Sequence, residues 1–60
     1  MPVITLETTH LNKEQKQQLT KQLTESAARI MNLPQEMFYV YLKEHSLDNV
    51  GVGGKLLSDK

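Results

Sequence analysis

The segment Met37-Phe-Tyr-Val-Tyr-Leu-Lys43 decides the fold of this chain, because it is predicted to form a strand with two apolar faces. Alternate residues are apolar on both sides, with Phe38, Val40 and Leu42 on one face and Met37, Tyr39 and Tyr41 on the other. All three aromatic residues of the protein lie in this segment, so much of its apolar surface that could be buried belongs to one strand. Neither face should remain in water, so the strand requires a covering layer on each side.

The stretch Lys13–Met31, upstream of this strand, is predicted to be a helix, since it contains no glycine or proline. Apolar residues recur on one of its faces at helical spacing: Leu19, Leu23, Ala27 and Ile30. Asn12 and Gln15 fit a capping box at its start. Asn32 suits a left-handed residue at its end, and Pro34 prevents continuation. Such a helix covers only one face of the downstream strand.

A first strand is predicted over Val3–Thr8, where Ile4 and Leu6 alternate with Thr5 and Glu7. A strand, a long helix and a second strand, in this order, form a βαβ unit. Its two strands are expected to be parallel and joined by a right-handed crossover.

All three glycines of the protein follow the second strand, within the sequence Val-Gly-Val-Gly-Gly at residues 50–54. This cluster predicts a tight hairpin or a bulge, because glycine permits positive φ angles. The expected fold is therefore α/β (α+β), with parallel strands, one long helix and a C-terminal β-hairpin. It forms a single domain that spans residues 1–60.

A chain of 60 residues buries only about 60% of the surface that its unfolded form exposes, so it is marginally stable alone. It contains no cysteine, and its two histidines, His10 and His45, lack the spacing of metal ligands. We therefore expect no disulfide and no metal site. Stabilisation is expected instead from a large hydrophobic interface between copies of the chain.

The charge of the chain is balanced, with seven basic and seven acidic residues. This balance argues against nucleic-acid binding, which needs an excess of Lys and Arg. No apolar run approaches the roughly 20 residues of a membrane span, and no secretory leader is recognisable. We expect a cytoplasmic protein that binds neither nucleic acid nor membrane.

Pro2 follows the initiator Met1 directly and would become the N-terminus once Met1 is removed. Its nitrogen would then be a secondary amine, able to act as a base. Pro2 shares its phase with Ile4 and Leu6, which places the ring on the apolar side of the first strand. Desolvation there would disfavour the ammonium form and lower the pKa of the amine towards neutrality, where a general base works best.

The order Met-Pro, strand, helix, strand and Gly-x-Gly-Gly within 60 residues resembles the 4-oxalocrotonate tautomerase family. The resemblance is carried by five features: Pro2, Glu14-Gln15-Lys16, Pro34, Glu44 and Gly51-Val52-Gly53-Gly54. It implies a homohexamer, built as a trimer of dimers, with active sites at subunit boundaries and no cofactor. It also implies that the Pro2 amine is the catalytic base, interconverting enol and keto forms of a small unsaturated 2-oxo acid.

Three positions depart from the family pattern. Well-known members carry an arginine in the turn after the first strand, a second arginine within the second strand, and an aromatic residue before the glycine motif. This chain has His10 in that turn, Tyr39 in that strand and Val50 before Gly51. Pro2 is therefore the only catalytic residue carried over, and a bidentate carboxylate clamp is missing.

The departing residues remain candidates for substrate binding. Tyr39 could donate one hydrogen bond to a substrate oxygen, or serve only as an interface aromatic. His10 or Lys13 could supply one positive charge, or His10 could be a solvated turn residue. Val50 could form a wall of the pocket.

Two further polar features have structural interpretations. Glu44 and His45 are expected in a polar loop. The sole arginine, Arg29, is expected to pair with Glu25 on the helix.

Two other functions stay open. A hydratase or dehalogenase on the same scaffold would need a water-activating carboxylate near Pro2, and Glu7 is out of phase with Pro2 on the first strand. A catalytically impaired oligomeric binding module is the other alternative. The neutral charge and the single long helix disfavour a ribbon-helix-helix DNA-binding protein.

Overall fold

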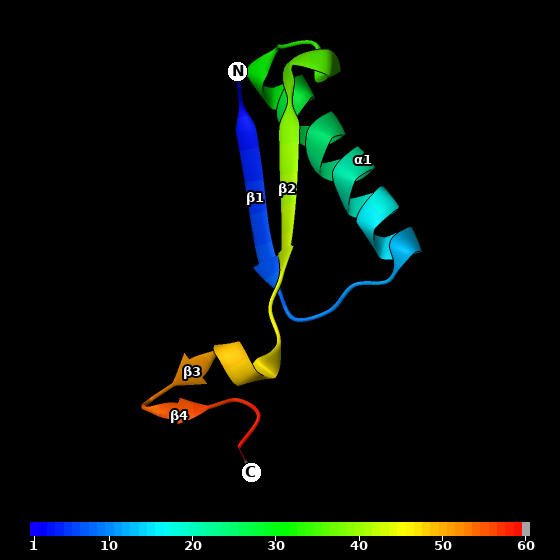
Figure 1. Cartoon of the computed structure of the whole chain (residues 1–60). Helices are drawn as coiled ribbons and strands as arrows, with labels where there is room; N and C mark the ends of the chain where they lie inside the picture. Colours follow the sequence, from blue (N-terminus) through cyan, green and yellow to red (C-terminus); the bar gives the residue numbers. More distant parts are fainter. Residues whose placement is uncertain (60) are drawn as a thin grey trace.

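The computed structural model describes residues 1–59 of the chain. Its elements, in order, are β1 (Val3–Thr8), α1 (Lys13–Met31), η1 (Gln35–Met37), β2 (Tyr39–Glu44), η2 (Leu47–Asn49), β3 (Gly51–Val52) and β4 (Lys55–Leu56). β1 and β2 lie side by side with α1 packed along them, and the β3–β4 hairpin lies beyond the far end of this pair (Figure 1). The predicted βαβ fold with one long helix and a C-terminal hairpin is confirmed.

β1 and β2 are parallel, and their register pairs Val3 with Tyr39 and Thr8 with Glu44. Backbone hydrogen bonds extend the pair at both ends. The Tyr39 N–H donates to the Pro2 carbonyl at 3.1 Å, and the His45 N–H donates to the Thr8 carbonyl at 2.8 Å. The strand pair is therefore held from Pro2 through His45.

The predicted start of the second strand at Met37 is wrong, because β2 begins at Tyr39. The amides just before it are used by the turn after the helix. The Met37 N–H donates to the Pro34 carbonyl at 3.2 Å, and the Phe38 N–H donates to the Gln35 carbonyl at 3.0 Å. These amides cannot also pair with β1.

The predicted bounds and caps of α1 are confirmed. The Gln15 N–H donates to Asn12 Oδ1 at 2.8 Å, and the Asn12 N–H donates to Gln15 Oε1 at 3.0 Å, which completes the capping box. Asn32 ends the helix with φ 59° and ψ 47°, in the left-handed conformation.

The apolar face predicted for the helix is correct except at its last member. Leu19, Leu23 and Ala27 are half-buried, but Ile30 is 77% exposed. Towards the end of the helix the covered side has moved to Ala28, which is 7% exposed. Ile30 is two positions after Ala28, which is about 200° around the helix, so burial of Ala28 leaves Ile30 facing outward.

The strand pair has one covered and one open face, as the two apolar faces of β2 predicted. Residues on the α1 side are half-buried: Ile4, Leu6, Phe38, Val40 and Leu42. Val3, Tyr39 and Tyr41 on the other side are each about half exposed. Ala28, at 7% exposure, is the only buried residue among residues 1–59. The single chain therefore lacks the dry core that a stable domain needs.

The glycine-rich segment forms the predicted tight hairpin. Gly53 and Gly54 have φ angles of 62° and 86° at the turn between β3 and β4. Two successive positive φ angles match the type I′ turn that suits the twist of hairpin strands. The Leu57 N–H donates to the Val50 carbonyl at 2.8 Å and closes the hairpin at its base.

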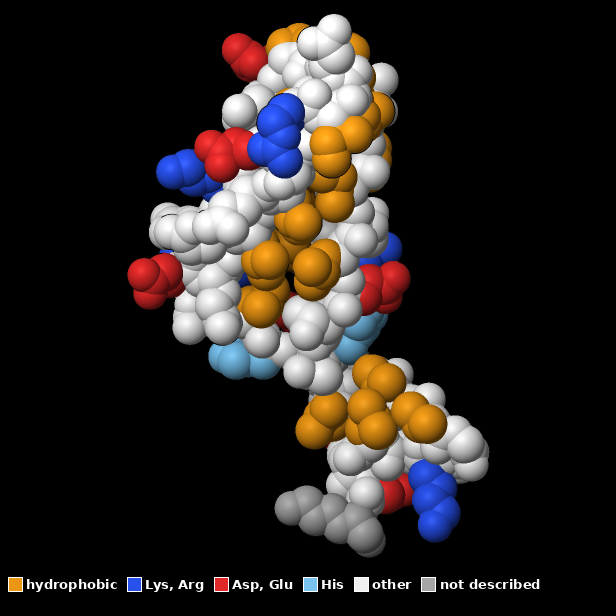
Figure 2. Space-filling view, turned by 180° about the vertical axis from the view of Figure 1, so that it is seen from behind, with side chains coloured by type: hydrophobic (Ala, Val, Ile, Leu, Met, Phe, Trp, Pro, Cys, Tyr) orange, Lys and Arg blue, Asp and Glu red, His pale blue; other side chains and the backbone are white. Residues whose placement is uncertain are grey.

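Hydrophobic side chains reach the surface along the βαβ body and form a separate group on the hairpin end (Figure 2). The exposed apolar residues of this end include Leu47, Val52, Leu56 and Leu57. Within residues 1–59, no helix is long and apolar enough to cross a lipid bilayer.

Candidate functional site

Pro2 lies directly before β1 and is half-buried, in the same alternation as Ile4 and Leu6. The hydrogen bond from the Tyr39 N–H to its carbonyl, at 3.1 Å, ties it to the first residue of β2. Met1 is 77% exposed, so the bond between Met1 and Pro2 lies at the surface. The position of the Pro2 nitrogen is thus determined by backbone pairing, without a flexible side chain.

Tyr39 is adjacent to Pro2 along the backbone, but the two side chains belong to opposite faces. Tyr39 pairs with Val3, and both are about half exposed on the open face. Pro2 has the phase of the covered face. In a single chain, the Tyr39 hydroxyl therefore points away from the side on which the Pro2 ring lies.

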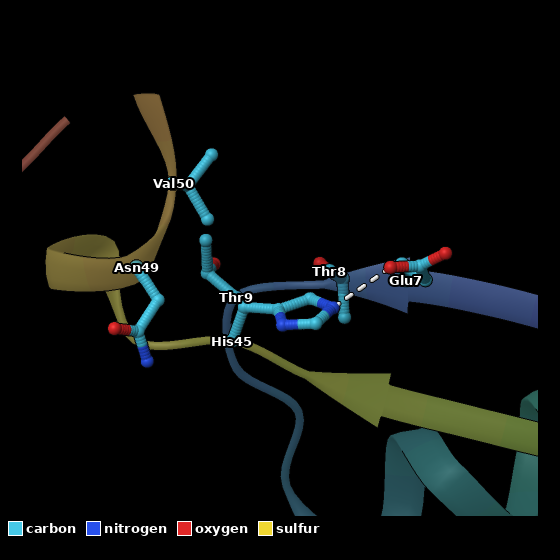
Figure 3. A pocket seen from close by; sticks show the side chains of 6 residues that line it. All are labelled: Glu7, Thr8, Thr9, His45, Asn49 and Val50. Atoms are coloured by element: carbon cyan, nitrogen blue, oxygen red, sulfur yellow. Dashed lines mark hydrogen bonds and ion pairs between the residues drawn. The ribbon is translucent and has the colours of Figure 1, made fainter. Parts of the chain in front are cut away.

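A cavity of about 350 Å³ lies at the other end of the strand pair, where the chain leaves β1 and passes from β2 to η2 (Figure 3). Its lining residues are Glu7, Thr8, Thr9, His45, Asn49 and Val50. Val50, whose predicted role as a wall of the Pro2 pocket stays a prediction, lines this cavity. Pro2 does not contribute to it.

Glu7 and His45 form the closest side-chain contact in this cavity, with 2.8 Å between Glu7 Oε1 and His45 Nε2 (Figure 3). The backbone of His45 is fixed as well, through its hydrogen bond to the Thr8 carbonyl. The prediction that Glu44 and His45 lie in a polar loop is wrong for Glu44 and correct for His45, which lies in the connection between β2 and η2. Glu44 is the last residue of β2, and His45 continues its pairing with β1.

A second polar cluster surrounds Glu44. Its Oε1 lies 2.7 Å from Lys16 Nζ, and its Oε2 accepts a hydrogen bond of 2.9 Å from the Leu11 N–H. The Lys16 hydrogen bond, followed by the Leu11 amide, holds the pKa of the Glu44 carboxyl below its ordinary value. Glu44 therefore fastens the loop between β1 and α1 to the end of β2.

His10, predicted to bind substrate, belongs to this second cluster. Its Nδ1 lies 3.6 Å from Glu44 Oε2, its side chain is 84% exposed, and it does not line the Val50 cavity. The predicted pair between Glu25 and Arg29 does not form among residues 1–59, whose three ion pairs involve other residues. An exposed pair of long, charged side chains contributes little stability, so little free energy is lost when Glu25 and Arg29 do not pair.

The predicted site residues thus lie at two ends of one strand pair. Pro2 and Tyr39 are at the start of β1 and β2, whereas Val50 and His10 are at the far end. Six residues of β1 at about 3.3 Å each separate the two ends by about 20 Å. Sequence reasoning missed Glu7, His45 and Asn49 as cavity residues, because their meeting depends on the strand register.

Comparisons with known proteins agree with this fold. Residues 2–60 match the Tautomerase family, described as "Tautomerase enzyme". Probable tautomerases of Bacillus cereus and Halalkalibacterium halodurans are each 34% identical to this chain over 61 residues, covering all of both chains.

Solved structures of similar proteins share this fold. A crystal structure of a 4-oxalocrotonate tautomerase homologue is 36% identical, with a TM-score of 0.92, covering 100% of this chain and 97% of the other. DmpI from Archaeoglobus fulgidus is 33% identical, with a TM-score of 0.87, covering 97% of this chain and 100% of the other. The chain is thus a small βαβ protein of the 4-oxalocrotonate tautomerase fold. It belongs to the tautomerase family, as the resemblance predicted.

Proposed function

We propose that this protein is a tautomerase that interconverts the enol and keto forms of a small unsaturated 2-oxo acid, with the Pro2 amine as its general base. The observation that carries the proposal is the position of Pro2. It is half-buried at the start of β1, its carbonyl accepts a hydrogen bond from the Tyr39 N–H, and the residue before it, Met1, is exposed. Removal of Met1 would leave a secondary amine at a defined place in an apolar setting.

The proton balance of the reaction needs no group beyond this amine. The Pro2 nitrogen takes the proton of the enol hydroxyl, and the electrons of that O–H bond complete the carbonyl. The electron pair of the C=C bond then takes the proton back from the ammonium, at the carbon next to the carbonyl. One O–H bond is replaced by one C–H bond, and the free amine is regenerated.

We further propose that the active site forms between subunits. Within one chain, Pro2 is about 20 Å from the cavity that contains Val50, so one substrate cannot reach both. The half-exposed Val3, Tyr39 and Tyr41 offer an apolar face that a second copy would cover. The family resemblance indicates a hexamer, in which the cavity end of one subunit meets Pro2 of another.

Hydration or dehalogenation of an unsaturated acid has less support. Such a reaction needs a carboxylate near Pro2 to activate water. Glu7 lines the cavity that the proposed assembly would bring to Pro2, but its Oε1 is already engaged by His45 at 2.8 Å.

The test combines intact mass with ketonisation of the phenylpyruvate enol. We expect the mature protein to lack Met1 and Pro2→Ala to lose activity by about 10²- to 10⁴-fold, the usual contribution of a general base. Arg29→Gln, which removes an exposed charge late in α1, should remain fully active. If Pro2→Ala ketonises the enol as fast as the parent protein, the proposed function is wrong.

A further inference from the structure

We propose that the cavity at the far end of β1 is a carboxylate-binding subsite, in which His45 anchors the acid group of the substrate and Glu7 positions the His45 ring. This proposal rests on the proposed function, because the subsite would hold a 2-oxo acid for the Pro2 amine of another subunit. His45 would take the place of the arginines that bind carboxylates in the family members described above.

The lining of the cavity has the chemistry of an anion site. Thr8 and Thr9 contribute hydroxyl donors, Asn49 contributes an amide N–H₂ group, and His45 contributes a ring nitrogen. Val50 is the apolar member and suits the hydrocarbon part of a ligand. A volume of about 350 Å³ lies in the range of small-molecule sites.

The one carboxylate in the lining, Glu7, is engaged by His45 at 2.8 Å. With Nε2 protonated, the ring donates to Glu7 Oε1, and this contact holds the ring from one side. The hydrogen bond from the His45 N–H to the Thr8 carbonyl fixes the backbone that carries the ring. Nδ1 lies on the other side of the ring and has no hydrogen-bond partner among residues 1–59 (Figure 3). A histidine protonated on both nitrogens can therefore donate to Glu7 and to a bound carboxylate at once.

Three other basic side chains are engaged elsewhere or lie far from the cavity. Lys16 and His10 both lie against Glu44, at 2.7 Å and 3.6 Å. Arg29 is in the last turn of α1, which ends near the start of β1 and thus far from the cavity (Figure 1). His45 is the basic side chain that lines the cavity itself.

The first experiment compares two substrates that differ only in the acid group: the enol of phenylpyruvate and the enol of its methyl ester. His45→Gln should lower kcat/KM for the acid by about ten- to a hundred-fold, the effect of one charge-assisted hydrogen bond, and change the ester by less than about threefold. Glu7→Gln should also lower kcat/KM for the acid, by a smaller factor. Arg29→Gln should leave kcat/KM unchanged for both substrates.

If His45→Gln lowers kcat/KM equally for both substrates, or lowers it for neither, the proposed carboxylate subsite is wrong. The methyl ester also tests the two proposals separately. If the parent protein converts the ester and Pro2→Ala does not, the base assignment holds whatever happens at the carboxylate subsite. If Pro2→Ala keeps its activity, the base assignment fails, and the subsite is judged by binding alone.

The binding experiment uses Pro2→Ala protein, which needs no turnover. Addition of 3-phenylpropanoate should shift the NMR signals of the His45 ring, whereas 3-phenylpropanamide should not. The His10 ring, which is outside the cavity, is the internal reference. Shifts at His10 alone, or equal shifts with acid and amide, would contradict the proposal.

Discussion

The two ends of the β1–β2 pair are built from different kinds of contact. At the start, the backbone hydrogen bond between Tyr39 and Pro2 joins the strands, and the neighbouring covered side chains are apolar. The far end also has a backbone hydrogen bond, from the His45 N–H to the Thr8 carbonyl, and it adds contacts between charged or polar side chains. Glu7 contacts His45, and Glu44 contacts Lys16 of α1. An apolar end favours a neutral amine, whereas a polar end with several donors favours an anion.

Under the proposed function, one chain carries two separate half-sites, with Pro2 at one end of the strand pair and the His45 cavity at the other. Here about 20 Å of β1 separates them, and assembly would bring Pro2 of one copy to the cavity of another. The following four predictions test that division, from the largest expected effect to the smallest.

Blocking the Pro2 amine should have the largest effect. A chain that retains Met1, or carries one extra residue before Pro2, should lose about 10²- to 10⁴-fold in kcat, because the nitrogen becomes an amide without basicity. The far end should be unaffected, so 3-phenylpropanoate should still shift the His45 ring in NMR spectra. Full activity in a blocked chain confirmed by intact mass would contradict the role of Pro2.

Placing a charge on the open face should break the contact between half-sites. Tyr41→Lys should weaken assembly by about 2 kcal/mol or more, about thirtyfold in the dissociation constant, since Tyr41 is half exposed in one chain and would be buried by a second copy. Analytical ultracentrifugation should show smaller particles, with activity falling in parallel. Gln17→Lys, on an exposed position of α1, is the matched control and should assemble normally.

A substitution that strains the β3–β4 hairpin should lower the stability of the protein. Gly53→Ala should lower the free energy of unfolding by about 1–2 kcal/mol per subunit, because its φ of 62° is unfavourable for a residue with a Cβ atom. No atom lies within 4 Å of the added Cβ, so the cost is conformational and not steric.

Gly51→Ala is the control for this change, because Gly51 does not have a positive φ and its Cβ would be 3.4 Å from the Lys55 carbonyl oxygen. Chemical denaturation measures both variants. Equal destabilisation of the two would argue against conformational strain at Gly53.

Acidification should loosen the far end by a modest amount. The pKa of Glu44 is lower in the folded chain than its ordinary value of 4.5, mainly through Lys16 and then the Leu11 amide. This group therefore contributes stability above about pH 4.5, and the contribution is lost as the pH falls through the lower folded value.

The melting temperature of the parent should accordingly exceed that of Glu44→Gln at pH 7, and the gap should narrow below pH 4.5. Hydrogen exchange at the Leu11 amide, which donates to Glu44 at 2.9 Å, should speed up in the variant. A gap that widens on acidification would contradict the assigned direction of the pKa change.

Local features of the fold were predictable from the sequence because short-range rules determine them. The capping box of Asn12 and Gln15, the left-handed Asn32 and the glycine hairpin each depend on residues a few positions apart. The start of β2 was misplaced by two residues, since a 3₁₀ turn after Pro34 uses the amides of Met37 and Phe38. Ile30 was misplaced because the covered side of the helix shifts towards Ala28 near its end.

By itself, the sequence determined the elements, their order and the chemical identity of Pro2, since these follow from alternation, helical spacing and one covalent position. Only the tertiary structure decided which side chains meet. Glu7 and His45 are 38 residues apart in sequence, and Leu11 and Glu44 are 33 apart. Their contacts depend on the register of two parallel strands, and a shift of one residue would move each side chain to the other face.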